Sequence, residues 1–122
     1  MIRGIDIEIV DTHEFWADYE KESDRNFFTA AEIEYCQSKA NCRQNYAVRY
    51  AAKKALFRSI NIRMTEPDIW QEVKILNNEL GKPEFHFSEN INSILESNNI
   101  RKVHLSLSHV ENAAIAMLVL ED

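Results

Sequence analysis

The stretch RQNYAVRYAAKKALFRSI, residues 43–60, decides the fold. It lacks glycine and proline and is rich in alanine, lysine and arginine, which makes it the strongest helix signal in the chain. Residues at the spacing of one helix face are predicted to turn toward the core: Ala47, Tyr50, Ala51 and Lys54. Lys54 then needs a partner, because an isolated buried ammonium favours loss of its proton.

Basic side chains of the same helix could hold a polyphosphate: Arg49, Lys53, Lys54 and Arg58. Arg49 and Lys53 are four residues apart and therefore face the same way. The alternative is an ordinary solvated helix face, which the spacing alone favours.

The flanking segments predict an α+β fold in which a small antiparallel sheet packs on this long central helix. Thr29 and Glu32 form a capping box that starts a helix toward Ala40. The other predicted elements are a surface helix over 11–26, a loop over 61–68, strands near 73–75 and 85–87 around a turn at 78–82, a short helix near 91–95, and strands over 103–107 and 113–120 joined through 108–112. No repeat or linker divides the chain, so residues 1–122 are predicted to form one domain.

The first strand, residues 2–10, has a period of two and is predicted to be half-buried. Ile5, Ile7 and Ile9 share one face, and Asp6 and Glu8 share the other. Two neighbouring carboxylates could hold a hard divalent cation such as magnesium, whereas the simpler interpretation is an exposed polar face.

Composition excludes several classes of function. With 122 residues and a formal charge of −6, the chain lacks the surplus of basic residues needed to attract nucleic acid or anionic membranes. Its two glycines are too few for a P-loop or a Rossmann fingerprint. Cys36 and Cys42 fit neither a zinc site nor a disulfide framework and are predicted to be free thiols, and the N-terminus does not resemble a signal peptide, so we expect a cytoplasmic protein.

Five blocks follow one another along the chain: Gly4-Ile5-Asp6-Ile7-Glu8; Asn26-Phe27-Phe28-Thr29 followed by Glu32; Arg49-Tyr50-Ala51-Ala52-Lys53-Lys54-Ala55; Gly81-Lys82-Pro83; and His104-Leu105-Ser106-Leu107-Ser108-His109. In this order and spacing they resemble the motifs of the 4'-phosphopantetheinyl transferases, and the short chain resembles the holo-acyl-carrier-protein synthase branch. Such enzymes move the phosphopantetheine arm of coenzyme A onto a serine of an acyl carrier protein. The resemblance therefore implies coenzyme A as co-substrate, magnesium at the diphosphate, a carrier protein as partner and a homotrimer.

The resemblance also implies roles for individual residues. Asp6 is expected to bind magnesium, with Glu8 as a second ligand in the manner of the longer branch of the family. Residues expected to be catalytic are Asp6, Lys53 and Lys54. Residues expected to bind coenzyme A are Arg49, Lys53, Arg58, Lys82, Ser108 and His109, where Arg58 takes the place of a lysine and retains phosphate affinity.

Three departures from the family pattern affect this interpretation. The family's helix glutamate, a magnesium ligand, is Lys54 here, so its ammonium could instead sit between Asp6 and Glu8 and replace the metal. The loop at 61–65 lacks the glycine usual near the phosphates. The first helix is acidic where typical members are basic, with Asp11, Glu14, Asp18, Glu20 and Glu22.

Two functions stay open on the sequence alone. One is an active transferase that uses Asp6 and Glu8 for magnesium and serves a less acidic carrier protein. The other is a non-catalytic relative that binds coenzyme A or a carrier protein while Lys54 prevents transfer. A purely structural oligomerisation partner is a third reading, but it leaves Lys53, Arg58 and His109 unexplained.

Overall fold

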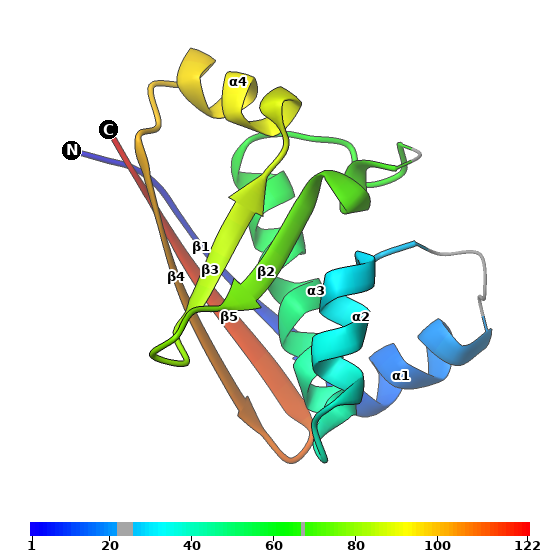
Figure 1. Cartoon of the computed structure of the whole chain (residues 1–122). Coiled ribbons are helices and arrows are strands. Elements are labelled where there is room, and N and C mark those ends of the chain that lie inside the picture. The colour runs from blue at the N-terminus through cyan, green and yellow to red at the C-terminus, as the bar shows by residue number, and fades with distance from the viewer. Residues whose placement is uncertain (22–25, 67) are drawn as a thin grey trace.

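A computed structural model of the chain describes residues 1–21, 26–66 and 68–122. The elements follow in the order β1 (Ile2–Asp11), α1 (Thr12–Lys21), α2 (Ala30–Gln37), α3 (Cys42–Ser59), a 3-10 helix η1 (Ile69–Glu72), β2 (Val73–Asn77), β3 (Pro83–Phe87), α4 (Glu89–Ser97), β4 (Lys102–Val110) and β5 (Ala113–Glu121). An antiparallel sheet of order β1-β5-β4 and the hairpin β2-β3 lie on different sides of α3 (Figure 1). The predicted α+β class is confirmed.

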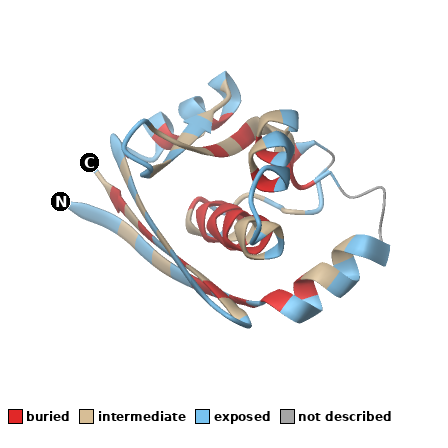
Figure 2. Ribbon diagram, turned by 60° about the horizontal axis from the view of Figure 1, so that its bottom comes forward, coloured by how far each residue is buried: buried red, intermediate tan, exposed pale blue. Residues whose placement is uncertain are grey.

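The central helix α3 is enclosed on several sides rather than along one stripe (Figure 2). Its buried residues are Tyr46, Ala47, Val48, Arg49, Ala51, Ala52, Lys53, Ala55, Leu56 and Phe57. The small alanines let the strands approach the helix closely, which explains the high alanine content of this stretch. The predicted core stripe is therefore too narrow: Lys53 is fully buried, whereas Lys54 is half-buried.

Strand β1 turns its acidic side chains toward the helix and its isoleucine side chains toward solvent, the reverse of a usual half-buried strand. Ile5, Ile7 and Ile9 are 60%, 55% and 67% exposed, whereas Glu8 is 6% exposed and Asp6 is half-buried on the helix side. The exposed polar face, considered above as the simpler interpretation, is therefore wrong. Periodicity shows which residues share a face, but not which face is covered.

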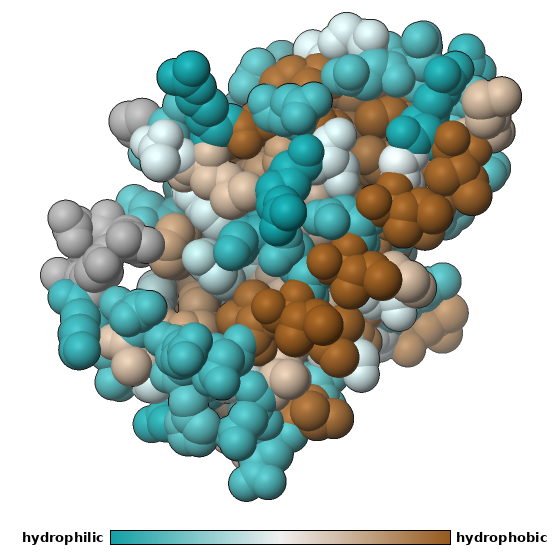
Figure 3. All heavy atoms as spheres, turned by 180° about the vertical axis from the view of Figure 1, so that it is seen from behind, coloured by the Kyte–Doolittle hydropathy of each residue, from teal (hydrophilic) through white to brown (hydrophobic). Residues whose placement is uncertain are grey.

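On the outside of the sheet, β1 and β5 form an apolar surface, the outer sheet face, made of Ile5, Ile7, Ile9, Ile115, Met117 and Val119. Strand β4 continues this side of the sheet with the polar residues His104, Ser106 and Ser108. In the antiparallel register Ile5 lies opposite Val119, Ile7 opposite Met117 and Ile9 opposite Ile115. Apolar side chains gather over this sheet when the molecule is seen from behind (Figure 3). An exposed apolar face of this kind is typical of an interaction surface.

Most predicted elements are confirmed, with differences at their ends. The capping box forms, because Glu32 N donates to Thr29 Oγ1 and Thr29 N donates to Glu32 Oε1. Strand β4 continues to Val110, so the connection to β5 is shorter than predicted, and η1 was not predicted. The helix predicted over 11–26 is observed as Thr12–Lys21, and residues 22–25, including Glu22, lie outside the described residues.

The described part of the chain contains neither a membrane-spanning helix nor a disulfide bond. None of its helices has the length and apolarity needed to cross a membrane. Cys36 and Cys42 are both free thiols, as predicted. Burial of Cys36 raises the pKa of its thiol to about 11, so this cysteine has the character of a core residue rather than a reactive one.

Candidate active site

The helix-facing side of β1 and the last turns of α3 bring together the first of the predicted site residues. Arg58 Nη1 donates to Glu8 Oε1 in an ion pair. The Glu8 side chain is 7% exposed and the Arg58 side chain 58% exposed. A buried carboxylate on the strand is thus neutralised by a guanidinium that extends into solvent.

Asp6 lies two residues before Glu8 on the same face of β1. Its Oδ2 is buried and has no hydrogen-bond partner among the described residues. A buried carboxylate oxygen without a donor is costly, and such atoms often mark the place of an ion or of an unseen water. This oxygen is therefore suited to coordinate a cation, and magnesium binding by Asp6 stays a prediction.

Lys54 does not occupy the place between Asp6 and Glu8. Its Nζ lies 5.3 Å from the centroid of the Tyr50 ring, and the described residues give it no ion pair with either carboxylate. The hypothesis of an ammonium that bridges the two acids is therefore wrong in this structure, where Arg58 pairs with Glu8 instead. Lys54 lines a hollow of about 240 Å³ together with the acidic residues Asp11, Glu14 and Asp18 and the rings of Phe15, Tyr19, Phe27 and Tyr50.

Lys53 is a structural residue in the described fold. Its side chain is 0% exposed, and Nζ donates to Glu32 Oε1 at 2.7 Å, to Phe27 O at 2.7 Å and to Trp70 O at 3.0 Å. Burial lowers the pKa of Lys53, and the neighbouring Glu32 carboxylate opposes this effect. All three ammonium donors are used, so the predicted contact of Lys53 with coenzyme A phosphates has no free donor here.

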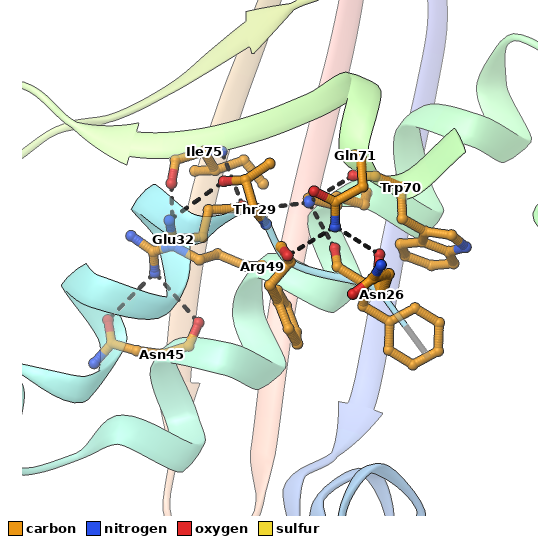
Figure 4. Close-up of polar contacts among 11 residues, drawn as sticks. Asn26, Thr29, Glu32, Asn45, Arg49, Trp70, Gln71 and Ile75 are labelled. Atoms are coloured by element: carbon orange, nitrogen blue, oxygen red, sulfur yellow. Dashed lines mark hydrogen bonds and ion pairs between the residues drawn. The ribbon is translucent and has the colours of Figure 1, made fainter. Parts of the chain in front are cut away.

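Arg49 is held in the same polar network, as Figure 4 shows. It is 1% exposed, and its guanidinium donates to Ile75 O at 3.1 Å, to Asn45 O at 3.2 Å and to Asn77 Oδ1 at 3.0 Å. The predicted role of Arg49 at coenzyme A is therefore opposed by its burial. Instead, Arg49 ties α3 to β2, much as Glu32 ties α2 to β2 by accepting from Ile75 N at 3.0 Å.

The sequence did not reveal that Glu32 is the partner of Lys53. The only sequence signal for Glu32 is the capping box, which accounts for a hydrogen bond to one of its two carboxylate oxygens. Glu32 Oε1 accepts from Thr29 N and from Lys53, while Oε2 accepts from Ile75 N. The second block of the family pattern thus supports the third through a buried ion pair.

The other predicted coenzyme A residues lie on exposed edges of the molecule. Lys82 is exposed in the turn of the β2-β3 hairpin, and Ser108 and His109 are exposed at the end of β4. His109 Nε2 lies 3.4 Å from Asn41 Nδ2, directly before α3. Since Arg58 lies in the last turn of α3, at 1.5 Å per residue it is roughly 26 Å along the helix from Asn41, so one chain does not bring His109 and Arg58 together.

A groove of about 890 Å³ runs between the hairpin, α4 and β4. The stacked rings of Phe85 and Phe87, 5.2 Å apart, form part of its wall. Lys82, Arg101 and His104 contribute basic groups to its lining. Of these residues the family pattern pointed only to Lys82 and His104.

The described residues contain no group of three or more histidine, cysteine, aspartate or glutamate side chains placed to hold a metal ion. Magnesium does not require such a group, because it commonly binds to one or two carboxylates together with water and substrate phosphates. Asp6, with its unpartnered oxygen, satisfies this smaller requirement.

Comparison with known proteins decides the family. Residues 3–118 match the model of the 4'-phosphopantetheinyl transferase superfamily. The chain belongs to this superfamily. It is 39% identical to the holo-[acyl-carrier-protein] synthase of Geobacter metallireducens over 99% of this chain and 98% of that protein, and 36% identical to the synthase of the same name from Geotalea daltonii over 99% of both chains.

Solved structures of the same class confirm the fold. The crystal structure of the holo-[acyl-carrier-protein] synthase from Neisseria meningitidis has a TM-score of 0.88 and 26% identity, with all of both chains covered. The synthase from Bacillus anthracis, solved in complex with CoA (3',5'-ADP), has a TM-score of 0.77 and 25% identity, covering 98% of this chain and 96% of that one. The predicted family, fold and transferase class of this superfamily member are therefore confirmed.

Proposed function

We propose that this transferase moves 4'-phosphopantetheine from coenzyme A to a serine of an acyl carrier protein. The observation that carries the proposal is its similarity, over nearly the full length of both chains, to relatives named holo-[acyl-carrier-protein] synthase. Coenzyme A and an acyl carrier protein are therefore its two substrates.

The reaction requires the serine hydroxyl to attack the phosphorus that bears the pantetheine arm. A new O–P bond forms, the diphosphate bond breaks, adenosine 3',5'-bisphosphate leaves, and the serine loses its proton. Catalysis depends on placing positive groups around the diphosphate, where charge develops. Arg58 offers a solvent-exposed guanidinium beside the strand carboxylates, and Lys82 offers a cation at the hairpin turn.

Magnesium is part of the proposal, with Asp6 as the protein ligand. Its buried, unpartnered Oδ2 fits a hard cation. When bound, magnesium would supply neutralising charge at the diphosphate. Glu8 has Oε2 outside its hydrogen bond with Arg58, but a cation at Oε2 would compete with the guanidinium for the charge of the same carboxylate.

A non-catalytic relative is the second candidate, and Lys54 is the observation that favours it. The residue at this position of the family pattern is an acid, whereas here an ammonium lies next to Tyr50. If the missing carboxylate is indispensable, the chain could keep coenzyme A binding without transfer.

Intact-mass analysis of an apo acyl carrier protein separates these candidates. The carrier is incubated with coenzyme A, magnesium and either the natural protein or Lys54→Glu. We expect the natural protein to add one phosphopantetheine mass to the carrier, and the variant to reach half its maximal rate at about tenfold lower magnesium, since a carboxylate restores a hard oxygen ligand. Transfer by the variant alone would instead identify the natural chain as the non-catalytic relative.

We also propose that the protein forms a homotrimer in the cytoplasm. Two observations support assembly: the outer sheet face is apolar and exposed, and His109 and Arg58 lie at opposite ends of α3. Residues too far apart within one chain can line one coenzyme A site if neighbouring copies contribute them. A closed ring of three copies satisfies this requirement.

Ile7→Asp is expected to convert the assembly to monomers, because a carboxylate placed in the centre of the outer sheet face would lose its hydration in the interface. Ile7 is 55% exposed, so the unfolding free energy of the isolated chain should change by only about 0.5 kcal/mol. Sedimentation equilibrium measures the change in mass. Leu80→Asp, at a residue 92% exposed in the hairpin turn, is the matched control and should retain the mass of the natural protein. An Ile7→Asp protein with that same mass would contradict the assignment of this face.

A further inference from the structure

The ion pair between Glu8 and Arg58 is unequal in burial. The Glu8 side chain points from β1 toward α3 and is 7% exposed, while the Arg58 side chain is 58% exposed. Only Nη1 of the guanidinium forms a side-chain hydrogen bond to a described residue. The other N–H donors of Arg58 have no hydrogen bond to a described residue, and more than half of the side chain is exposed to solvent.

Glu8 needs this partner more than Arg58 does. A carboxylate removed from water is costly unless a donor or a counter-charge satisfies it. Arg58 is the single described side chain that donates to Glu8. A metal ion bound at Oε2 of Glu8 would repel the Arg58 guanidinium and compete with it for the charge of the same carboxylate, so Glu8 serves one cation better than two.

Holding one edge of an arginine prepares the other edge for a ligand. A long side chain loses conformational entropy when it binds, and a guanidinium fixed in advance loses less of it. Lys54 lies one helical turn before Arg58 and has no comparable carboxylate anchor among the described residues. Arg58 is therefore the cation of this helix face that the fold holds in one place.

We propose that Glu8 is a positioning residue for Arg58. Glu8 holds the guanidinium so that its open edge receives the diphosphate of coenzyme A, and Asp6 alone remains for magnesium. The inference rests on the proposed function, because it takes coenzyme A as the ligand. It assigns Glu8 a task different from that of a metal ligand.

A double-mutant cycle on coenzyme A binding tests this role. Calorimetric titrations with coenzyme A compare the natural protein with Glu8→Gln, Arg58→Ala and the double variant, in magnesium and in EDTA. We expect Glu8→Gln and Arg58→Ala each to weaken binding about tenfold, and the double variant to bind no more weakly than Arg58→Ala. The ratio of affinities in magnesium and EDTA should be the same for Glu8→Gln as for the natural protein.

Two controls keep the result specific. Glu20→Gln makes the same chemical change at an exposed carboxylate of α1 and should leave binding unchanged. Urea unfolding of each variant identifies losses caused by instability, and Arg58→Lys should recover only part of the affinity, because it restores charge without the guanidinium fork.

Other outcomes would overturn the assignment. Additive losses in the double variant would show that Glu8 and Arg58 act independently. A Glu8→Gln protein with natural affinity in EDTA but at least tenfold weaker magnesium dependence would make Glu8 a metal ligand. Absence of coenzyme A binding by the natural protein would also overturn the inference, whereas coupled binding without transfer to any carrier would support it and refute the proposed function.

Discussion

Lys53→Met is expected to lower the unfolding free energy by about 3–5 kcal/mol, the usual cost of removing one partner of a buried ion pair. Lys53 and Glu32 are both 0% exposed, and their contact distance is 2.7 Å. Methionine fills a similar volume but donates to none of the three acceptors that Lys53 satisfies: Glu32 Oε1, Phe27 O and Trp70 O. Urea unfolding followed by tryptophan fluorescence measures the loss, since Trp70 accepts one of these bonds.

Two further variants separate the ion pair from simple packing. Adding Glu32→Gln to Lys53→Met removes the stranded carboxylate charge, so the double variant should be more stable than the sum of the single losses predicts. Lys54→Met, at the neighbouring half-buried lysine, should change stability by no more than about 1 kcal/mol. If Lys53→Met instead keeps its stability and loses only coenzyme A affinity, Lys53 is the phosphate ligand that the family pattern predicts.

The contrast between Lys53 and Lys54 shows what periodicity can and cannot establish. The helix itself follows from residues 43–60, because its composition leaves no other regular structure favourable. The composition and spacing do not show which sides of the helix are buried, because an analysis by one apolar stripe assumes that a single face meets the core. Here the sheet and the hairpin contact α3 from different directions, and the lysine that enters the core is the one for which Glu32, far away in sequence, supplies a partner.

Strand β1 shows the same limit on the other side of the core. Alternation correctly separates Ile5, Ile7 and Ile9 from Asp6 and Glu8. Hydrophobicity then suggests that the isoleucines face inward, but the structure turns them outward. The acids can face α3 because Arg58 satisfies Glu8, and that pairing depends on how strand and helix pack rather than on any local pattern.

The sequence predicts which motifs form the candidate site, but it predicts less well what each of their residues does. The first and third blocks do place Asp6, Glu8 and Lys54 on the strand and helix that meet at the site, and Arg58 follows the third block on the same helix. The pattern could not tell that Arg49 and Lys53 are used up within the core, because their backbone acceptors come from β2, η1 and the residues before α2. Such acceptors carry no side-chain signature in a sequence.

Asp6→Asn is expected to lower the rate of phosphopantetheine transfer by at least about 100-fold, since several kcal/mol of charge stabilisation depend on the metal and each 1.36 kcal/mol is tenfold in rate. An amide is a much poorer ligand for a hard cation than a carboxylate. The rate is measured by the intact mass of the carrier protein at saturating coenzyme A and over a range of magnesium concentrations.

The unfolding free energy of Asp6→Asn should not fall together with its transfer rate. Asp6 Oδ2 is buried without a donor among the described residues, so its charge costs free energy in the folded chain without magnesium. Asparagine removes this charge, and the unfolding free energy in EDTA should stay within about 1 kcal/mol of the natural value or increase. Adding magnesium to the coenzyme A complex should raise the melting temperature of the natural protein further but leave that of Asp6→Asn unchanged, because only the natural carboxylate gains from the cation. A variant that loses both activity and stability would make Asp6 a structural residue, and one that keeps its rate would remove Asp6 from the metal site.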